Sequence, residues 1–212
     1  MPKVTEAYKQ QKKEMIIKSA LQVLQYKALY ELTMIDVIKQ ANLSKGGIYL
    51  YFSDIDELIV AVLNAVFEEQ EELCLLEATT EGDIETKLVH IFGKLGDYME
   101  FCSPIVAKMR YELSVYLANN PDKMEKILQE VKFQKTGAQF MTLVEELIHK
   151  GVETKVFQNH LDLDVIMRNI SIYLDGMTDF VTRMIVYNGP KLKYAVRTYC
   201  EQYIKAQISQ WN

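Results

Sequence analysis

The chemistry that stands out in this sequence is phosphate binding. Within residues 45–51 the chain carries Lys45, Gly46, Gly47, Tyr49 and Tyr51. A lysine ammonium and tyrosine hydroxyls are suited to phosphate oxygens. A glycine inside a helix costs about 1 kcal/mol relative to alanine, so two in succession suggest that the backbone closely approaches another molecule. The wall of a DNA groove is a fitting candidate.

Two short helices joined by a tight turn are predicted to position these residues. Thr33 is suited to cap a first helix that ends near Ala41. Asn42 tolerates the left-handed backbone that a sharp helix end needs, and Ser44 can cap a second helix over 45–52. The first helix is expected to expose three polar residues and bury four others. The exposed ones are Asp36, Lys39 and Gln40, and the buried ones are Met34, Val37, Ile38 and Ala41.

The apolar spacing is helical along nearly the whole chain, and only 9 Gly and 4 Pro interrupt it. Nine helices and no sheet are predicted, so the fold class is all-α. The expected helices cover 9–29, 33–41, 45–52, 54–76, 84–101, a segment from Pro104, 121–150, 164–187 and 190–208. Ser53 or Asp54 is expected to cap the fourth helix, and Gly151 to end the seventh.

Charge is distributed unevenly along the chain. Residues 1–53 hold eight lysines against four acidic residues, a formal charge of +4, whereas the other 159 residues total −9. A basic head on an acidic body suits a protein that meets a polyanion at one end. No stretch has 18 consecutive apolar residues and the start has no hydrophobic signal core, so we expect a cytoplasmic protein that does not bind membranes. Three separated cysteines predict reduced, packed side chains.

The segment from Thr33 to Phe52 resembles the DNA-binding domain of the TetR-like transcriptional regulators. The matching positions are Thr33, Ala41, Asn42-Leu43-Ser44, Gly46, Tyr49, Phe52 and Leu58, within a similarity that covers about residues 9–68. The chain departs from the family pattern at three places. Asn42 replaces a turn glycine, Ala28-Leu29 replaces Gly-Tyr, and Ile55 replaces a lysine, which removes one expected phosphate contact.

The resemblance implies a three-helix helix-turn-helix head, residues 1–53, joined to a six-helix regulatory and dimerisation body, residues 54–212. Residues 45–52 would be the recognition helix in the major groove, with Leu43, Ile48 and Phe52 packing the head. The expected DNA-binding residues are Thr33, Ser44, Lys45, Gly46, Gly47, Tyr49 and Tyr51. The basic start, Lys3, Lys9, Lys12 and Lys13, is a further candidate for flanking phosphates or a minor groove.

The body is expected to bind an effector and to dimerise. Apolar side chains recur at helical spacing in 164–187 and 190–208, and by resemblance these two helices pair across a two-fold axis. Methionines and aromatic residues can line an adaptable pocket, although core packing is their commoner role. The candidate set for a hydrophobic or amphipathic small molecule is Phe92, Met99, Met109, Arg110, Leu113, Met141, Tyr173 and Met177.

Together these features predict a sequence-specific DNA-binding regulator, a repressor that a small-molecule effector releases from its double-stranded operator. An enzyme is disfavoured because the chain shows no nucleotide-binding or nucleophile motif. One Glu-x-x-His pair, Glu146 and His149, lacks the partner pair that a di-metal bundle needs, so no metal, cofactor or catalytic residue is expected. The alternative is an all-helical adaptor that binds another protein, which would leave Gly46, Gly47 and Tyr49 unexplained.

Overall fold

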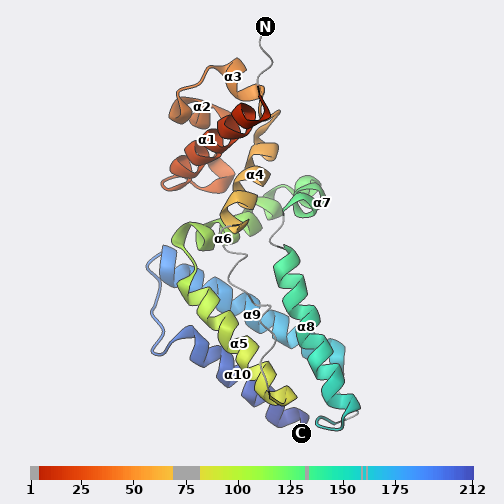
Figure 1. Cartoon of the computed structure of the whole chain (residues 1–212). Coiled ribbons are helices and arrows are strands. Elements are labelled where there is room, and N and C mark those ends of the chain that lie inside the picture. The colour runs from red at the N-terminus through yellow and green to blue at the C-terminus, as the bar shows by residue number, and fades with distance from the viewer. Residues whose placement is uncertain (1–4, 69–81, 132–133, 159, 161) are drawn as a thin grey trace. The chain divides into compact units, whose positions relative to one another are not determined.

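The computed structural model describes residues 5–68, 82–131, 134–158, 160 and 162–212 (Figure 1). Within these ranges it contains ten α-helices, one 3-10 turn and no strand, which confirms the all-α prediction. The helices are α1 (Glu6–Leu24), α2 (Met34–Ala41), α3 (Lys45–Tyr49), α4 (Ile55–Glu68), α5 (Ile84–Phe101), α6 (Pro104–Asn119), α7 (Pro121–Glu130), α8 (Gln134–Glu153), α9 (Leu163–Val186) and α10 (Val196–Trp211), with the 3-10 turn η1 at Leu29–Glu31.

The chain divides into two compact units. Unit 1 comprises residues 1–69 and 108–133, and unit 2 comprises residues 70–107 and 134–212. This division concerns packing alone. The functional boundary expected between residues 53 and 54 stays a prediction.

Unit 1 contains the expected three-helix head, with α1 packed against α2 and α4 (Figure 1). Its fully buried side chains include Ile16, Ala20, Val37, Ile48 and Leu58. Because these residues come from four different helices, each short helix of the head is fixed by apolar contacts with the others.

A buried ion pair on α6 holds the segment between α1 and α2. Lys108 Nζ donates hydrogen bonds to the carbonyl oxygens of Leu24 and Lys27, where α1 ends. Glu112 Oε2 accepts a bond of 2.7 Å from the backbone N–H of Leu29, and Glu112 Oε1 lies 3.6 Å from Lys108 Nζ. Carbonyls at a helix end have no partner within the helix, so α6 supplies the partners that α1 lacks.

Unit 2 is organised around the close contact of α5 with α10. A Cβ atom added at Gly96 would lie 2.6 Å from Cα of Arg197, so only glycine allows this approach. Glu100 on α5 accepts a 3.0 Å hydrogen bond from the backbone N–H of Val196, the first residue of α10. A core of large apolar residues from α5, α8, α9 and α10 includes Phe92, Phe140, Ile170 and Ile204.

The expected helix over 121–150 is wrong, because it is two helices. α7 ends at Glu130, and the next residue, Val131, has an extended backbone with φ of −86° and ψ of 122° and a buried side chain. α8 begins at Gln134. The described helices after the head therefore number seven instead of six.

Other helix ends differ from the predicted ones by several residues. α1 begins at Glu6, capped by Thr5, and ends at Leu24 instead of residue 29. α3 ends at Tyr49 instead of residue 52, and α10 spans Val196–Trp211 instead of 190–208. α8 continues past Gly151 to Glu153, with the ring of Phe157 against that glycine. α4 is described to Glu68, and its expected continuation to residue 76 lies outside the described residues.

Candidate nucleic-acid interface

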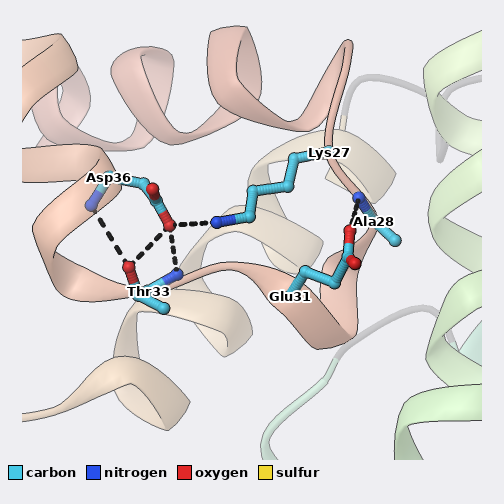
Figure 2. A network of polar contacts seen from close by, with 5 residues as sticks. All are labelled: Lys27, Ala28, Glu31, Thr33 and Asp36. Atoms are coloured by element: carbon cyan, nitrogen blue, oxygen red, sulfur yellow. Dashed lines mark hydrogen bonds and ion pairs between the residues drawn. The ribbon is translucent and has the colours of Figure 1, made fainter.

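The interface candidate begins where α2 starts, and Figure 2 shows the polar network there. Thr33 Oγ1 accepts a 3.3 Å bond from the backbone N–H of Asp36, and the Asp36 carboxylate accepts 3.0 Å from the backbone N–H of Thr33. This reciprocal capping box confirms Thr33 as the helix cap. Because the caps satisfy two backbone donors that the helix leaves free, they fix the direction in which α2 begins.

Asp36 also pairs with Lys27, a contact that the sequence did not indicate. Lys27 Nζ lies 2.6 Å from Asp36 Oδ2 (Figure 2). The hydrogen bonds from Lys27 and from Thr33 lower the pKa of Asp36. The expected exposure of Asp36 is therefore wrong: its side chain is half-buried, and it joins the end of α1 to the start of α2.

The other side chains of α2 follow the expected pattern in most positions. Met34 and Val37 are buried, whereas Lys39 and Gln40 are exposed. Ile38 and Ala41 were expected to be buried and are only partly so. Both lie towards the C-terminal end of α2, beside the turn that leads to α3.

The turn between α2 and α3 has the predicted conformation. Asn42 is left-handed, with φ of 51° and ψ of 45°. Ser44 caps α3, because its Oγ accepts a 3.0 Å hydrogen bond from the backbone N–H of Gly47. The short side chain of Asn42 tolerates this backbone, so the residue at this position holds the shape that the family pattern achieves with glycine.

Helix α3 buries one side and exposes the other. Ile48 is fully buried and Phe52, just beyond the helix, is 2 % exposed, which anchors α3 in the head. Lys45 and Gly46 are exposed, Tyr49 is 43 % exposed, and Leu50 is 81 % exposed. The outward side of α3 is therefore a lysine, a bare stretch of backbone, a tyrosine and a leucine.

The two glycines of α3 have different surroundings. A Cβ atom at Gly46 would meet nothing within 4 Å, so packing inside the chain does not require glycine there. A Cβ at Gly47 would lie 3.1 Å from Ser44 Oγ, the atom that caps the helix. Space inside the protein explains the glycine at 47, but the glycine at 46 needs an explanation outside it.

The structure places the seven expected DNA-binding residues on two connected segments. Ser44 to Tyr51 lie on α3 and its two ends, and Thr33 lies at the start of α2. Thr33, Ser44, Lys45, Gly46 and Tyr49 are exposed, whereas Gly47 and Tyr51 are partly buried. The hydroxyls of Thr33 and Ser44 serve as helix caps in the free protein.

The basic start of the chain is partly engaged in local contacts. Lys9 pairs with Glu6 at 2.8 Å on an exposed surface. Lys12 lies over the ring of Tyr8, and Lys13 lies over the ring of Phe52. Lys3 lies outside the described residues. Lys13 thus connects the start of the chain to the end of the α3 segment.

The eight effector candidates fall in both compact units. Met109, Arg110 and Leu113 belong to unit 1. The five in unit 2 belong to its apolar core or pack against it, and they are Phe92, Met99, Met141, Tyr173 and Met177. Tyr173 stacks on Tyr203 with ring centroids 3.7 Å apart, a contact that the sequence did not indicate. None of the helices in the described ranges is long and apolar enough to span a bilayer.

The geometry of the head defines a helix-turn-helix protein, and comparison with known proteins gives the same class. Residues 16–62 match the family model for bacterial regulatory proteins of the tetR family. A relative from Bacillus subtilis (strain 168), described as the uncharacterized HTH-type transcriptional regulator YfiR, is 24% identical over 158 residues, which are 74% of this chain and 73% of the relative. The chain is therefore similar to transcriptional regulators of the tetR family, and the match to the family model lies over its helix-turn-helix head.

Solved structures with the same fold cover nearly the whole chain. The repressor MexZ of Pseudomonas aeruginosa superposes with a TM-score of 0.68 at 17% identity, covering 96% of each chain. The regulator FadR of Bacillus subtilis, in complex with stearoyl-CoA, has a TM-score of 0.59 at 16% identity and covers 92% of this chain and 97% of its own. At such identities the likeness concerns the fold alone.

Proposed function

We propose that this regulator is a homodimeric repressor that holds a two-fold symmetric operator with α3 and leaves it when a small molecule binds residues 54–212. The observation that carries the DNA-binding assignment is the outward side of α3. Lys45 and Tyr49 are exposed on either side of Gly46, whose missing side chain nothing inside the chain explains. Exposed backbone between two side chains that can donate hydrogen bonds to phosphate oxygens suits entry into a major groove.

Each proposed contact has a definite role. Lys45 supplies a charge-assisted bond to a phosphate, and the hydroxyls of Tyr49 and Tyr51 supply neutral ones. Gly46 and Gly47 let the backbone approach the groove wall. Thr33 and Ser44 fix the starts of α2 and α3, and the backbone amides at these helix starts favour a nearby phosphate.

The proposed homodimer fits the geometry of B-DNA. A helix-turn-helix dimer reads two half-sites about 34–36 Å apart, so one head alone would read half an operator. We assign dimerisation to α9 and α10, and the operator is expected to be palindromic because a two-fold protein presents two identical surfaces.

The effector is proposed to be hydrophobic or amphipathic, because the candidate residues in unit 2 belong to an apolar core. Stearoyl-CoA, which is bound in the solved FadR structure, is therefore a suitable first amphipathic probe. A ligand changes operator affinity only through its different affinities for the two protein states, and a tenfold effect corresponds to about 1.4 kcal/mol.

A footprinting experiment tests this function. Genomic fragments retained by the immobilised protein would be sequenced and then footprinted with and without stearoyl-CoA or a panel of smaller apolar compounds. We expect protection of an inverted repeat with half-site centres one helical turn apart, and loss of protection with one of the probes. Retention of no fragment above a control protein of equal charge would contradict the repressor assignment, and protection that no probe alters would contradict effector release.

A further inference from the structure

A cavity at the surface between α5 and α10 is lined by none of the eight effector candidates. The two helices lie side by side in unit 2 (Figure 1), and the cavity between them has a volume of about 530 Å³. Small molecules bind in cavities of this order of size. Val89 of α5 and Ile208 of α10 give the cavity an apolar part, and most of its other lining residues are charged or polar.

One end of the cavity is built from charges that neutralise one another. Arg197 pairs with Asp97 of α5, and its Nε donates a 2.7 Å hydrogen bond to Glu201 Oε1. A Cβ atom at Gly93 would lie 2.6 Å from Glu201 Oε1, so glycine lets this group lie against α5. Because Arg197 is held from both sides, this end of the cavity is formed before any ligand arrives.

Two other charges in the cavity are not neutralised by any residue that the structure describes. Within the described ranges Lys205 of α10 makes no ion pair or hydrogen bond. Glu85 of α5 accepts a 3.1 Å hydrogen bond from the side-chain amide of Asn212, which carries no charge. The half-buried imidazole of His90 likewise has no hydrogen-bond partner among the described residues. The cavity therefore presents an ammonium, a carboxylate and an imidazole to a ligand.

We propose that this cavity binds a small zwitterion, an amino acid or a short peptide, whose carboxylate meets Lys205 and whose ammonium meets Glu85. These two residues belong to different helices, so the ligand bridges α10 and α5. The ligand's apolar side chain lies against Val89 and Ile208. The site is separate from the effector site of the proposed function and goes beyond that function.

The charge balance of the lining favours a zwitterion over a simple anion or cation. Apart from His90, the lining has two acidic residues, Glu85 and Glu201, and two basic residues, Arg197 and Lys205. It therefore has no excess charge to attract an ion of one sign. A ligand with one charge of each sign gains a charge-assisted hydrogen bond at both ends, and the imidazole of His90 is a further donor for its carboxylate.

The cavity and the proposed homodimer use different sides of α10. The α10 residues that line the cavity recur mostly every three or four positions, so they share the side that faces α5. Gln202, Ala206 and Gln210 form a second, exposed row on this helix. Dimerisation through that row leaves the cavity accessible.

Blocked derivatives of one amino acid test the proposal. Leucine carries both charges, N-acetyl-leucine lacks the ammonium, and leucine amide lacks the carboxylate. Isothermal titration calorimetry of the full-length protein should show saturable binding of leucine. Each derivative should bind about tenfold more weakly, because it loses one hydrogen bond to a charged group. Leucyl-leucine is titrated in parallel, and the tighter of the two unblocked probes shows whether the ligand is a free amino acid or a short peptide.

Two variants assign the two charges. In Glu85→Gln the difference in affinity between leucine and N-acetyl-leucine should disappear, while the difference between leucine and leucine amide remains. Lys205→Gln should show the reverse, and the difference that each variant retains shows that it is folded. Glu146→Gln, which removes an exposed charge on α8, is the matched control and should retain both differences.

Three results would overturn the site and leave the repressor function standing. The first is no saturable binding of leucine or leucyl-leucine by the wild type. The second is equal affinity of the wild type for leucine and its two derivatives. The third is that Glu85→Gln and Lys205→Gln both retain the full selectivity of the wild type.

Discussion

Gly46 is the residue at which folding and DNA binding make opposite demands. A helix gains up to about 1 kcal/mol when alanine replaces glycine, and space for the methyl group is available at this position. We therefore expect Gly46→Ala to leave stability unchanged or raise it, while the added methyl group weakens operator binding about tenfold or more. Thermal unfolding and fluorescence anisotropy with operator DNA measure the two effects separately.

Gly137→Ala is the matched control for Gly46→Ala. Gly137 lies in α8, is exposed, and also has open space where a Cβ atom would be. It should change stability in the same direction and leave operator affinity unaltered. Unchanged affinity in Gly46→Ala itself would mean that the backbone of α3 does not approach DNA closely.

The buried pair on α6 gives a second prediction for single residues. Glu112→Ala should reduce the free energy of unfolding by about 3 kcal/mol, because it leaves Lys108 without its opposite charge and the backbone N–H of Leu29 without an acceptor. Glu112→Gln keeps an oxygen for Leu29 and should lose less. Chemical denaturation checks both, and equal losses would show that the acceptor for Leu29 contributes nothing.

Residues that act locally could be predicted from the sequence, and residues that act over a distance could not. The roles of Thr33, Asn42 and Ser44 depend on backbone groups at most three residues away, so residue type and order predict them. The Lys27–Asp36 pair joins two helices across a loop, and the Lys108–Glu112 clamp reaches more than eighty residues back along the chain. Neither contact leaves a local pattern.

At the scale of elements, the contact between α5 and α10 depends on a glycine. Gly96→Ala places a methyl group against the backbone of Arg197, and a backbone atom cannot move aside as the end of a side chain can. We expect a loss of about 1–3 kcal/mol, the usual range for overpacking. Differential scanning calorimetry, again with Gly137→Ala as the control, measures it. A stable Gly96→Ala protein would show that α10 shifts on α5 without penalty.

The sequence predicted which segments are helical better than it predicted where each helix ends. Pro104 and Asn120-Pro121 marked two helix starts correctly, because proline suits the first helical turn. The break at Val131 was missed because the flanking segment contains no glycine or proline, so only burial of Val131 distinguishes it. The start of α10 was also missed, since the carboxylate that holds its first N–H comes from Glu100 on α5.

At the scale of the whole molecule, the chain combines a basic N-terminal segment with an acidic remainder, which gives a polyanion one favoured end to approach. Affinity for DNA should therefore fall steeply with salt, because each phosphate contact releases counterions. The sequence could not distinguish effector-binding residues from core residues, because apolar side chains at helical spacing occur in both cores and pockets. The eight candidate residues fall in two compact units.

The most direct test of the account is the salt dependence of operator binding for the wild type and for Lys45→Ala/Tyr49→Phe. Fluorescence anisotropy with labelled DNA from around the protein's own gene would be recorded between about 50 and 200 mM salt, with Lys150→Ala/Tyr194→Phe as a control at exposed positions outside the head. The account predicts tight wild-type and control binding with a steep salt slope, and a weaker variant whose slope is flatter by about one for each lost phosphate contact. Equal affinities and slopes for all three proteins, or no binding by the wild type, would contradict the assignment of α3 as the DNA-binding helix.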